Sequence, residues 1–345
     1  MSQLLVTGGA GFIGSHLIRG WLARHPEDRV VNLDLLTYAG SPERLADLAG
    51  SARYRFVQGD ICDAKAVREA MRGCQLVVHL AAETHVDRSI TDAAPFLRTN
   101  VEGTYVLLEA ARELGVSRVL HVSTDEVYGP VLEGAVDEQA PISPRSPYAA
   151  SKAAGDLLAQ SYRATHGVPV LVARPTNIYG PAQFIEKLIP LTIINSLEGA
   201  RVPIYGDGQQ RRAWLYVEDA ASALQAIMAQ GQLGEVYNVA GGIERANVDT
   251  AKTVIALAGR GEELLQFVAD RPGHDRRYAM RDAKLRALGW QPAVSFDEGI
   301  SRTVAWYRDH REWWQPLAKR LREDSYHWLN RPARPSAGQS ARPAR

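Results

Sequence analysis

The sequence predicts an α/β protein built on a doubly wound parallel sheet, with a smaller, interleaved C-terminal α/β domain. Two observations predict this fold. In the first half, short β-branched runs alternate with helical patterns, which is typical of βαβ units and a parallel sheet. After Gly180, prolines and glycines break the pattern into shorter pieces, and a length of 345 residues suggests about two domains.

The apolar pattern predicts the elements in order. The first strand, 4–6, ends at a glycine-rich loop, and a helix follows over 16–22. Further strands are expected at 30–34, 54–57, 76–80, 119–122 and 170–173, with a long helix over about 100–114. We predict that residues 1–180 with about 213–240 form the first domain, that 181–212 with 241–330 form the second, and that 331–345 are a disordered tail.

The charge balance argues against a nucleic-acid partner. The formal net charge is +1, but the last fifteen residues hold four of the 40 basic residues and no acidic one. Without them, 36 basic residues face 39 acidic ones, so the body is weakly acidic and carries no basic footprint for nucleic acid.

The sequence also favours a reducing compartment. Its two cysteines, Cys62 and Cys74, make a disulfide scaffold implausible. The N-terminus leads directly into a strand without a charged leader or an apolar signal region, and no apolar run approaches the length of a bilayer span. We therefore expect a cytoplasmic protein without a membrane partner.

The loop after the first strand carries a dinucleotide-binding fingerprint, because Gly8, Gly11 and Gly14 follow the spacing G-x-x-G-x-x-G. Gly8 permits a tight turn, Gly11 lets a pyrophosphate approach, and Gly14 lets the helix pack closely on the strand. The positive helix N-terminus then faces the phosphates. Asp34, 20 residues after Gly14, would accept from the adenosine ribose hydroxyls and repel a 2′-phosphate. A Rossmann-type domain that binds NAD is predicted; the alternative is a plain glycine turn.

Two carboxylates follow the buried strand 119–122, in the segment STDEVYG. Active-site residues of open parallel sheets lie where such strands end. Burying Asp125 beside Glu126 is costly, because each carboxylate loses hydration and the two repel. The pair therefore indicates an active site. The alternative is a helix N-cap, with Thr124 or Asp125 capping and an acid in the first turn.

Tyr148 and Lys152 stand four residues apart, so they share one helix face. A nearby cation stabilises phenolate and lowers the tyrosine pKa, which would make Tyr148 a usable base near neutral pH. The alternative is an ordinary surface pair. His85 and Asp87 have no third ligand at a suitable spacing, so we expect no metal and a structural use for them.

Together these motifs resemble the extended short-chain dehydrogenase/reductases and, among them, the dTDP-glucose 4,6-dehydratases. The resemblance covers about residues 3–310, and its most specific element is the acidic pair, which related 4-epimerases usually lack. The matching segments are LTYAG (36–40), HVDRSI (85–90), STDEVYG (123–129), SPYAASKA (146–153), EKLIPL (186–191), WLYVED (214–219) and RPGHDRRY (271–278).

The resemblance implies a hydro-lyase that uses bound NAD on a nucleotide-diphosphate hexose. Tyr148, helped by Lys152, would take the proton of the sugar 4-hydroxyl while the C4 hydride passes to NAD⁺, and Thr124 would bond the same oxygen. Glu126 would remove the C5 proton, and Asp125 would protonate the departing 6-hydroxyl. The hydride then returns to C6, which gives a 4-keto-6-deoxy sugar.

The resemblance also implies further contacts for the two ligands. Three of the expected contacts have alternatives: Lys187 as a surface charge on a helix, Arg212 as part of a solvated run with Arg211, and His274 as a polar loop residue. The expected cofactor contacts are Phe12, Ile13, Asp60 (at the adenine), Ile61, Ala81, Ala82 and Asn100. The expected substrate contacts are Thr84 (at the sugar), Asn177, Lys187, Leu188, Arg212, Asn247, Arg271 and His274.

Three residues depart from the dehydratase pattern. Ile178 replaces an asparagine, Ala182 an aromatic residue and Ala213 an aspartate. The looser Asn-x-Tyr-Gly-Pro motif is shared with nucleotide-sugar epimerases and decarboxylases. A 4-epimerase and a non-catalytic NAD-binding scaffold or sensor are therefore the alternatives to a dehydratase, and the base and the hexose stay open.

The resemblance further implies a homodimer, paired through the helices that begin near Asn100 and Tyr148. Partly apolar faces on these helices are consistent with pairing, or equally with inward packing. The residues concerned are Val106, Leu107, Leu108, Ala111, Leu157 and Leu158.

Overall fold

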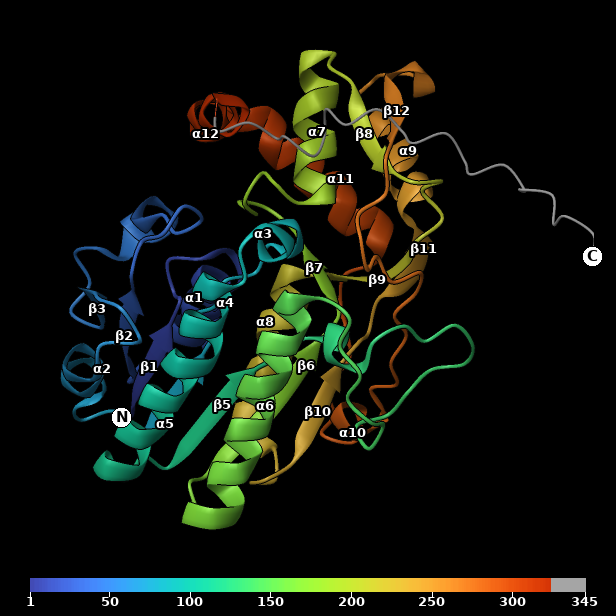
Figure 1. The fold of residues 1–345 in the computed structure, drawn as a ribbon. Coiled ribbons are helices and arrows are strands. Elements are labelled where there is room, and N and C mark those ends of the chain that lie inside the picture. The colour runs from blue at the N-terminus through green and yellow to red at the C-terminus, as the bar shows by residue number, and fades with distance from the viewer. Residues whose placement is uncertain (324–345) are drawn as a thin grey trace, which may run out of the picture.

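The computed structural model describes residues 1–323 and contains a seven-stranded, wholly parallel sheet (Figure 1). The strand order is β10-β6-β5-β4-β1-β2-β3. The order reverses between β1 and β4, and ligands of doubly wound sheets bind outside the carboxyl ends of strands at such a point. The strands are β1 (Gln3–Thr7), β2 (Arg29–Asp34), β3 (Tyr54–Gln58), β4 (Leu76–His79), β5 (Arg118–Val122), β6 (Val170–Pro175) and β10 (Val236–Val239).

Helices cover both faces of this sheet, because side chains of a strand alternate between its faces. Leu4 and Val6 of β1 pack in the cluster of α1 and α8, whereas Leu5 packs in the cluster of α2, α5 and α6. The covering helices are α1 (Phe12–Arg24), α8 (Val217–Gln230), α2 (Ala64–Met71), α5 (Gly103–Leu114) and α6 (Pro147–His166).

A smaller lobe lies above the carboxyl ends of the large sheet (Figure 1). It contains a three-stranded sheet, β11-β9-β7, and a parallel pair, β12-β8. Its elements are β7 (Asn177–Tyr179), α7 (Leu188–Glu198), β8 (Val202–Tyr205), β9 (Arg211–Tyr216), β11 (Ile243–Ala246), α9 (Asn247–Leu257), β12 (Leu265–Val268), α11 (Phe296–Asp309) and α12 (Arg311–Glu323).

Short elements connect these parts. They are η1 (Pro42–Leu48), α3 (Val86–Thr91), α4 (Ala94–Leu97), η2 (Arg98–Glu102), η3 (Asp125–Tyr128), η4 (Glu262–Leu264) and α10 (Ala283–Arg286). The chain crosses between the lobes more than once, since β9 belongs to the small sheet and β10 to the large one. The predicted domain boundaries stay a proposal. The small sheet combines strands of both predicted domains, because β7 lies in the first and β11 in the second.

The sequence explains why α6 begins where it does. Ser146 accepts a hydrogen bond from the Ala149 N–H at 3.1 Å, and Pro147 occupies the first helical position, where no N–H is needed. The helix ends at Gly167, whose φ of 70° suits the left-handed cap. This start places Tyr148 in the first turn and Lys152 one turn later.

Several predictions can be compared with these elements. All six expected strands are present, and the fourth ends at His79 rather than one residue later. The helix expected over 100–114 begins as a π-turn, η2, and continues as α5. Leu107 and Leu108 are fully buried in the core, so the inward-packing alternative holds for them, and Ala111 joins them there.

Other predictions concern the surface and the tail. Both cysteines are free thiols. No helix among residues 1–323 combines the length and apolar character needed to cross a membrane. The predicted tail, 331–345, and the last residues of the predicted second domain lie outside the described residues.

Candidate active site

A cavity of about 470 Å³ lies where the carboxyl ends of the large sheet meet the small lobe. Its wall includes every predicted site residue except Asn100. From the large lobe these are Gly8, Gly11, Phe12, Ile13, Gly14, Asp34, Asp60, Ile61, Ala81, Ala82, Thr84, Thr124, Asp125, Glu126, Tyr148 and Lys152. From the small lobe and its sheet they are Asn177, Lys187, Leu188, Arg212, Asn247, Arg271 and His274.

The glycine loop has the conformation that its spacing predicts. Gly8 has a φ of 71°, and a Cβ there would stand 2.7 Å from the Ala81 nitrogen. A Cβ on Gly14 would stand 2.4 Å from the Gly8 carbonyl oxygen. Gly11 begins α1 without a side-chain cap, so the first N–H groups of the helix stay available to an anion.

Two carboxylates lie along the cofactor end of the cavity. Asp34 accepts from the Ala10 N–H at 2.9 Å and from the Leu36 N–H at 2.8 Å, which fixes its plane. Burial raises the pKa of Asp34, and these two hydrogen bonds oppose the rise. Asp60 accepts from the Cys62 N–H at 2.9 Å and pairs with Arg98 at 2.7 Å.

Asn100 lies one layer behind the cavity. Its amide group accepts from the Glu83 N–H at 2.9 Å and donates to the Glu83 carbonyl at 3.0 Å and to the Ser151 hydroxyl at 2.9 Å. Asn100 therefore fixes the backbone between Ala82 and Thr84, which line the cavity, rather than facing a ligand itself.

The N-cap alternative and the active-site interpretation both apply to the segment after β5. Thr124 caps the short helix η3 by accepting from the Glu126 N–H at 3.3 Å. Its hydroxyl also lies 3.2 Å from the Asp125 carboxylate, to which it donates. Capping does not remove the acidic pair from the site, because both carboxylates line the cavity.

The two carboxylates have different surroundings. Burial, followed by the charge of Glu126, raises the pKa of Asp125 to about 7. Burial also raises the pKa of Glu126, but the positive charges of Arg271, Arg212 and Lys187 all oppose it. Asp125 can therefore donate a proton near neutral pH, while three cations favour the charged form of Glu126.

Tyr148 and Lys152 share a helix face, but their predicted electrostatic coupling is wrong for this structure. The pKa of Tyr148 is raised, first by burial and then by the charge of Glu126, while a hydrogen bond with Thr124 opposes the rise. The Lys152 ammonium donates to the Val122 carbonyl at 2.7 Å, and burial lowers its pKa to about 8. Burial outweighs the charge effect that the spacing alone suggests.

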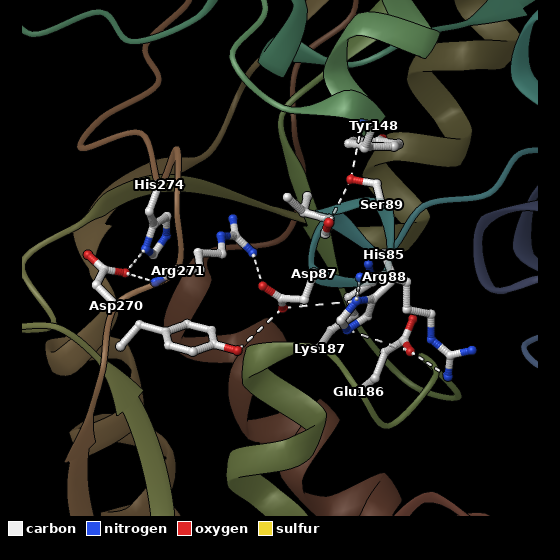
Figure 2. A network of polar contacts seen from close by, with 12 residues as sticks. His85, Asp87, Arg88, Ser89, Tyr148, Glu186, Lys187, Asp270, Arg271 and His274 are labelled. Atoms are coloured by element: carbon white, nitrogen blue, oxygen red, sulfur yellow. Dashed lines mark hydrogen bonds and ion pairs between the residues drawn. The ribbon is translucent and has the colours of Figure 1, made fainter. Parts of the chain in front are cut away.

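Helix α3 connects Tyr148 to the small lobe, as Figure 2 shows. The Ser89 hydroxyl accepts from the Tyr148 N–H at 3.1 Å, so α3 holds the first turn of α6. Two residues earlier in α3, the Asp87 carboxylate lies 3.6 Å from Arg271 and accepts from the Tyr205 hydroxyl at 3.4 Å (Figure 2). The base-like tyrosine and the predicted diphosphate-binding arginine thus contact the same short helix.

The small lobe offers a second anion-binding surface. Helices α7 and α9 both begin at the cavity without side-chain caps, at Lys187 and Ala246. Their N-terminal N–H groups and partial positive charge favour an anion. Arg212 and Arg271 add guanidinium groups, whose forks suit phosphate oxygens.

Buried polar atoms without a protein partner mark where a ligand would bind. Several side chains on the cavity wall have such an atom, and four of them are the Asn177 and Asn247 amide oxygens, the Arg271 Nε and the Trp214 indole nitrogen. Buried polar atoms are nearly always hydrogen-bonded in native proteins, so these four fit a polar ligand at the small-lobe end.

Some wall residues were not predicted from the sequence. Thr176 donates to the Asp125 carboxylate at 3.3 Å, while Glu186, Tyr205 and Trp214 line the small-lobe side. Thr176 was overlooked although it directly precedes Asn177 in the predicted motif. Among the departures, Ile178 lines the cavity, which leaves an apolar group where an amide was expected.

The metal alternative has no support in residues 1–323, where no group of three His, Cys, Asp or Glu side chains is placed to hold a metal ion. The His85 ring lies 3.9 Å from Asp87 and 3.7 Å from Glu186, within the network around α3 (Figure 2). Burial holds the pKa of His85 well below its usual range, which is consistent with the structural use that we expected.

The sheet order, the glycine loop and the Tyr148/Lys152 pair define an extended short-chain dehydrogenase/reductase. A model of the GDP-mannose 4,6 dehydratase family matches residues 5–303. The chain belongs to this family.

Individual relatives narrow the comparison. The dTDP-glucose 4,6-dehydratase of Streptomyces niveus is 51% identical over 320 residues, which are 91% of this chain and 95% of the relative. The crystal structure of DesIV, a dTDP-glucose 4,6-dehydratase from Streptomyces venezuelae with NAD and TYD bound, has a TM-score of 0.90 and 48% identity, covering 91% of this chain and 99% of that one. The UDP-glucose 4-epimerase of Thermus thermophilus in complex with NAD has a TM-score of 0.82 and 35% identity, covering 89% and 99%. The fold alone therefore does not separate the two activities.

Proposed function

We propose that this protein is an NAD-dependent 4,6-dehydratase of a nucleotide-diphosphate hexose, with dTDP-glucose as the first candidate substrate. One observation carries the proposal: Asp125 and Glu126 line the same cavity as Tyr148, with the pKa of Asp125 at about 7 and three cations beside Glu126. Elimination of water needs an acid and a base beside one substrate. The relatives at about half identity support the same activity.

The residues of the cofactor end fit NAD. Gly8, Gly11 and Gly14 leave room for a pyrophosphate at the free N-terminus of α1, and Asp34 presents a fixed carboxylate for ribose hydroxyls. NAD, when bound, accepts a hydride from C4 of the sugar and returns it to C6.

The side chains would divide the proton transfers among themselves. Tyr148 takes the proton of the sugar 4-hydroxyl, helped by the Lys152 ammonium one helical turn later. Thr124 forms a hydrogen bond with the same sugar oxygen. The resulting 4-ketone acidifies C5–H, and Glu126 accepts that proton. Asp125, in its protonated form, gives its proton to the 6-hydroxyl, so that the C6–O bond breaks and water leaves. A proton returns to C5 as C6 is reduced, and the product is a 4-keto-6-deoxy sugar.

The diphosphate would bind at the small lobe. The N-termini of α7 and α9 point their N–H groups at the cavity, and Arg212 and Arg271 supply charge. The unpartnered amide oxygen of Asn247 and the Arg271 Nε gain partners when a nucleotide is present.

A 4-epimerase is the alternative, because it shares the fold and the tyrosine base. It has no step that uses Asp125 and Glu126, and burying both carboxylates is costly. The acidic pair therefore favours the dehydratase over the epimerase, and the intact Thr124, Tyr148 and Lys152 argue against a non-catalytic sensor.

We further propose a cytoplasmic homodimer, paired through α5 and α6. Tyr105 and Leu157 on these helices are about half exposed, at 48% and 54%, and would become buried in such a pair. Sedimentation at micromolar protein concentration would give a dimer, and Leu157→Arg would weaken it. A wild-type monomer contradicts the dimer without affecting the proposed activity.

The activity is tested by incubating the purified protein with dTDP-, UDP-, GDP- and CDP-glucose. We expect one substrate to yield a product lighter by one water, with a 4-keto group detectable by its alkaline absorbance. Interconversion of glucose and galactose nucleotides without loss of water would establish the epimerase instead.

A further inference from the structure

Arg44 is a buried cation that bridges four separate segments of the chain. It lies in η1 and is only 6% exposed. Its guanidinium donates to the carbonyls of Ala10 at 2.9 Å, Ala39 at 2.8 Å and Ala182 at 3.0 Å. The same group lies 5.2 Å from the centre of the Trp313 ring of α12. None of these contacts serves the chemistry described above.

The three carbonyls belong to residues in the cavity wall or directly beside it in the chain. Ala10 lies in the glycine loop, and its N–H donates to Asp34 at 2.9 Å. Ala39 lines the cavity, in the loop that follows β2. Ala182 has a φ of 60°, which is unusual for a residue with a Cβ, and it lies in the connection from β7 to α7.

We propose that Arg44 is a positioning residue for the cofactor, which clamps the glycine loop to the loop after β2 and ties both to the small lobe. This inference rests on the proposed function, because it assumes that NAD occupies this end of the cavity. Ala10 is held from both sides, its N–H by Asp34 and its carbonyl by Arg44 together with the Ser41 N–H at 3.0 Å. Loss of the clamp would free the ribose carboxylate and the Ala39 loop together.

Arginine suits this place better than lysine. A guanidinium holds its N–H donors in one rigid plane, and here Nε and one Nη serve three carbonyls, whereas the three donors of an ammonium share one nitrogen on a flexible stem. Burial lowers the pKa of Arg44 to about 10, so the group remains a cation at neutral pH. Its central carbon also lies over the Trp313 ring, at a cation–π distance, which links cofactor retention to α12.

The test compares Arg44→Met and Arg44→Lys with a matched control, Arg53→Met. Arg53 also donates to two backbone carbonyls, of Leu22 at 3.0 Å and His25 at 3.2 Å, but it lies before β3, away from the cavity. For each purified variant, the bound nicotinamide is released by denaturation and quantified. The rate of NAD dissociation and the melting temperature are then measured on reloaded protein.

We expect Arg44→Met to lose NAD at least about tenfold faster than the wild type. A factor of about ten corresponds to the conformational free energy of ordering the backbone of one residue. The NAD dissociation rate of Arg44→Lys should lie between those of Arg44→Met and the wild type. Arg53→Met should lower the melting temperature while it releases NAD at the wild-type rate. If Arg44→Met does not fold, the dissociation rate of Arg44→Lys decides the question alone.

Two results would overturn the inference. One is a wild-type dissociation rate in the Arg44 variants; the other is an equal loss of NAD from Arg53→Met, which would make the effect one of general stability. In both cases the wild type still binds NAD, and the proposed function survives. A wild type with no affinity for NAD would overturn the proposed function together with this inference.

Discussion

Replacing Asp125 with asparagine tests the assignment of the acid. The substitution keeps the size of the side chain and its capacity to accept from Thr124 and Thr176, but it removes the proton that the 6-hydroxyl needs. An acid or base contributes about 10²–10⁴-fold to a rate. We expect Asp125→Asn to lose product formation by a factor in this range while it still oxidises the sugar at C4.

The structure also gives the sign of the pH dependence. The pKa of Asp125 is about 7, so about half of the wild-type protein holds the acid protonated at pH 7, and the elimination step slows above this pH. Asp125→Asn should lack this alkaline limb. Thr176→Val removes a hydrogen bond that lowers the pKa of Asp125, so in that variant the limb should move to higher pH.

A stability measurement checks the same pKa without substrate. Because the folded pKa of about 7 exceeds the usual value of 3.8, stability from the protonated form is complete below about pH 4 and is lost as the pH rises to about 7. Between about pH 5 and pH 8 the wild type should therefore lose on the order of 3 kcal/mol that Asp125→Asn does not lose.

The assays are quenched-flow product analysis across pH and urea unfolding at two pH values. A wild-type rate of water loss in Asp125→Asn would refute the assignment of the acid. An equal pH dependence of unfolding in both proteins would refute the raised pKa on which the assignment rests.

Three further predictions concern the base Tyr148, the Ser89 hydroxyl that holds its helix, and the glycine loop that would bind NAD. Tyr148→Phe should abolish C4 oxidation while nucleotide-sugar affinity, measured calorimetrically, stays close to the wild type; unaltered turnover would remove Tyr148 from its role. Ser89→Ala removes the acceptor for the Tyr148 N–H and should lower kcat roughly tenfold with little change in KM, so a change confined to KM would contradict it. Gly14→Ala would place a Cβ 2.4 Å from the Gly8 carbonyl oxygen and should abolish NAD binding, whereas Gly50→Ala, with nothing within 4 Å, should leave it intact.

Much of the large lobe could be predicted from the sequence, because its strands are continuous apolar runs separated by helices. The glycine loop could be located because only certain residues fit a tight turn beside a phosphate, and Asp34 because it ends the next strand at the spacing of the fingerprint. The small lobe was predicted only as a second domain. Its strands are three to six residues long and partly polar, so they lack the continuous apolar runs that mark the strands of the large lobe. In addition, β7 and β9 pair across many intervening residues.

The finer properties of the site depend on contacts that no local pattern reveals. The spacing of Tyr148 and Lys152 predicts a lowered tyrosine pKa, but burial raises it instead. Asn100 was assigned to the cofactor, yet it holds the backbone of Glu83 one layer away. The clamp formed by Arg44 includes a hydrogen bond to Ala182, 138 positions away, and sequence reasoning has no means to find such a contact.

The most direct test of the dehydratase assignment is Glu126→Gln, assayed with the preferred nucleotide-glucose in deuterated solvent. The variant keeps the size of the side chain but cannot accept the C5 proton. Stopped-flow absorbance should show reduced nicotinamide accumulating with substrate, while product formation falls by about 10²–10⁴-fold and deuterium no longer enters C5. Wild-type turnover in this variant, or wild-type product without deuterium at C5, would contradict the assignment.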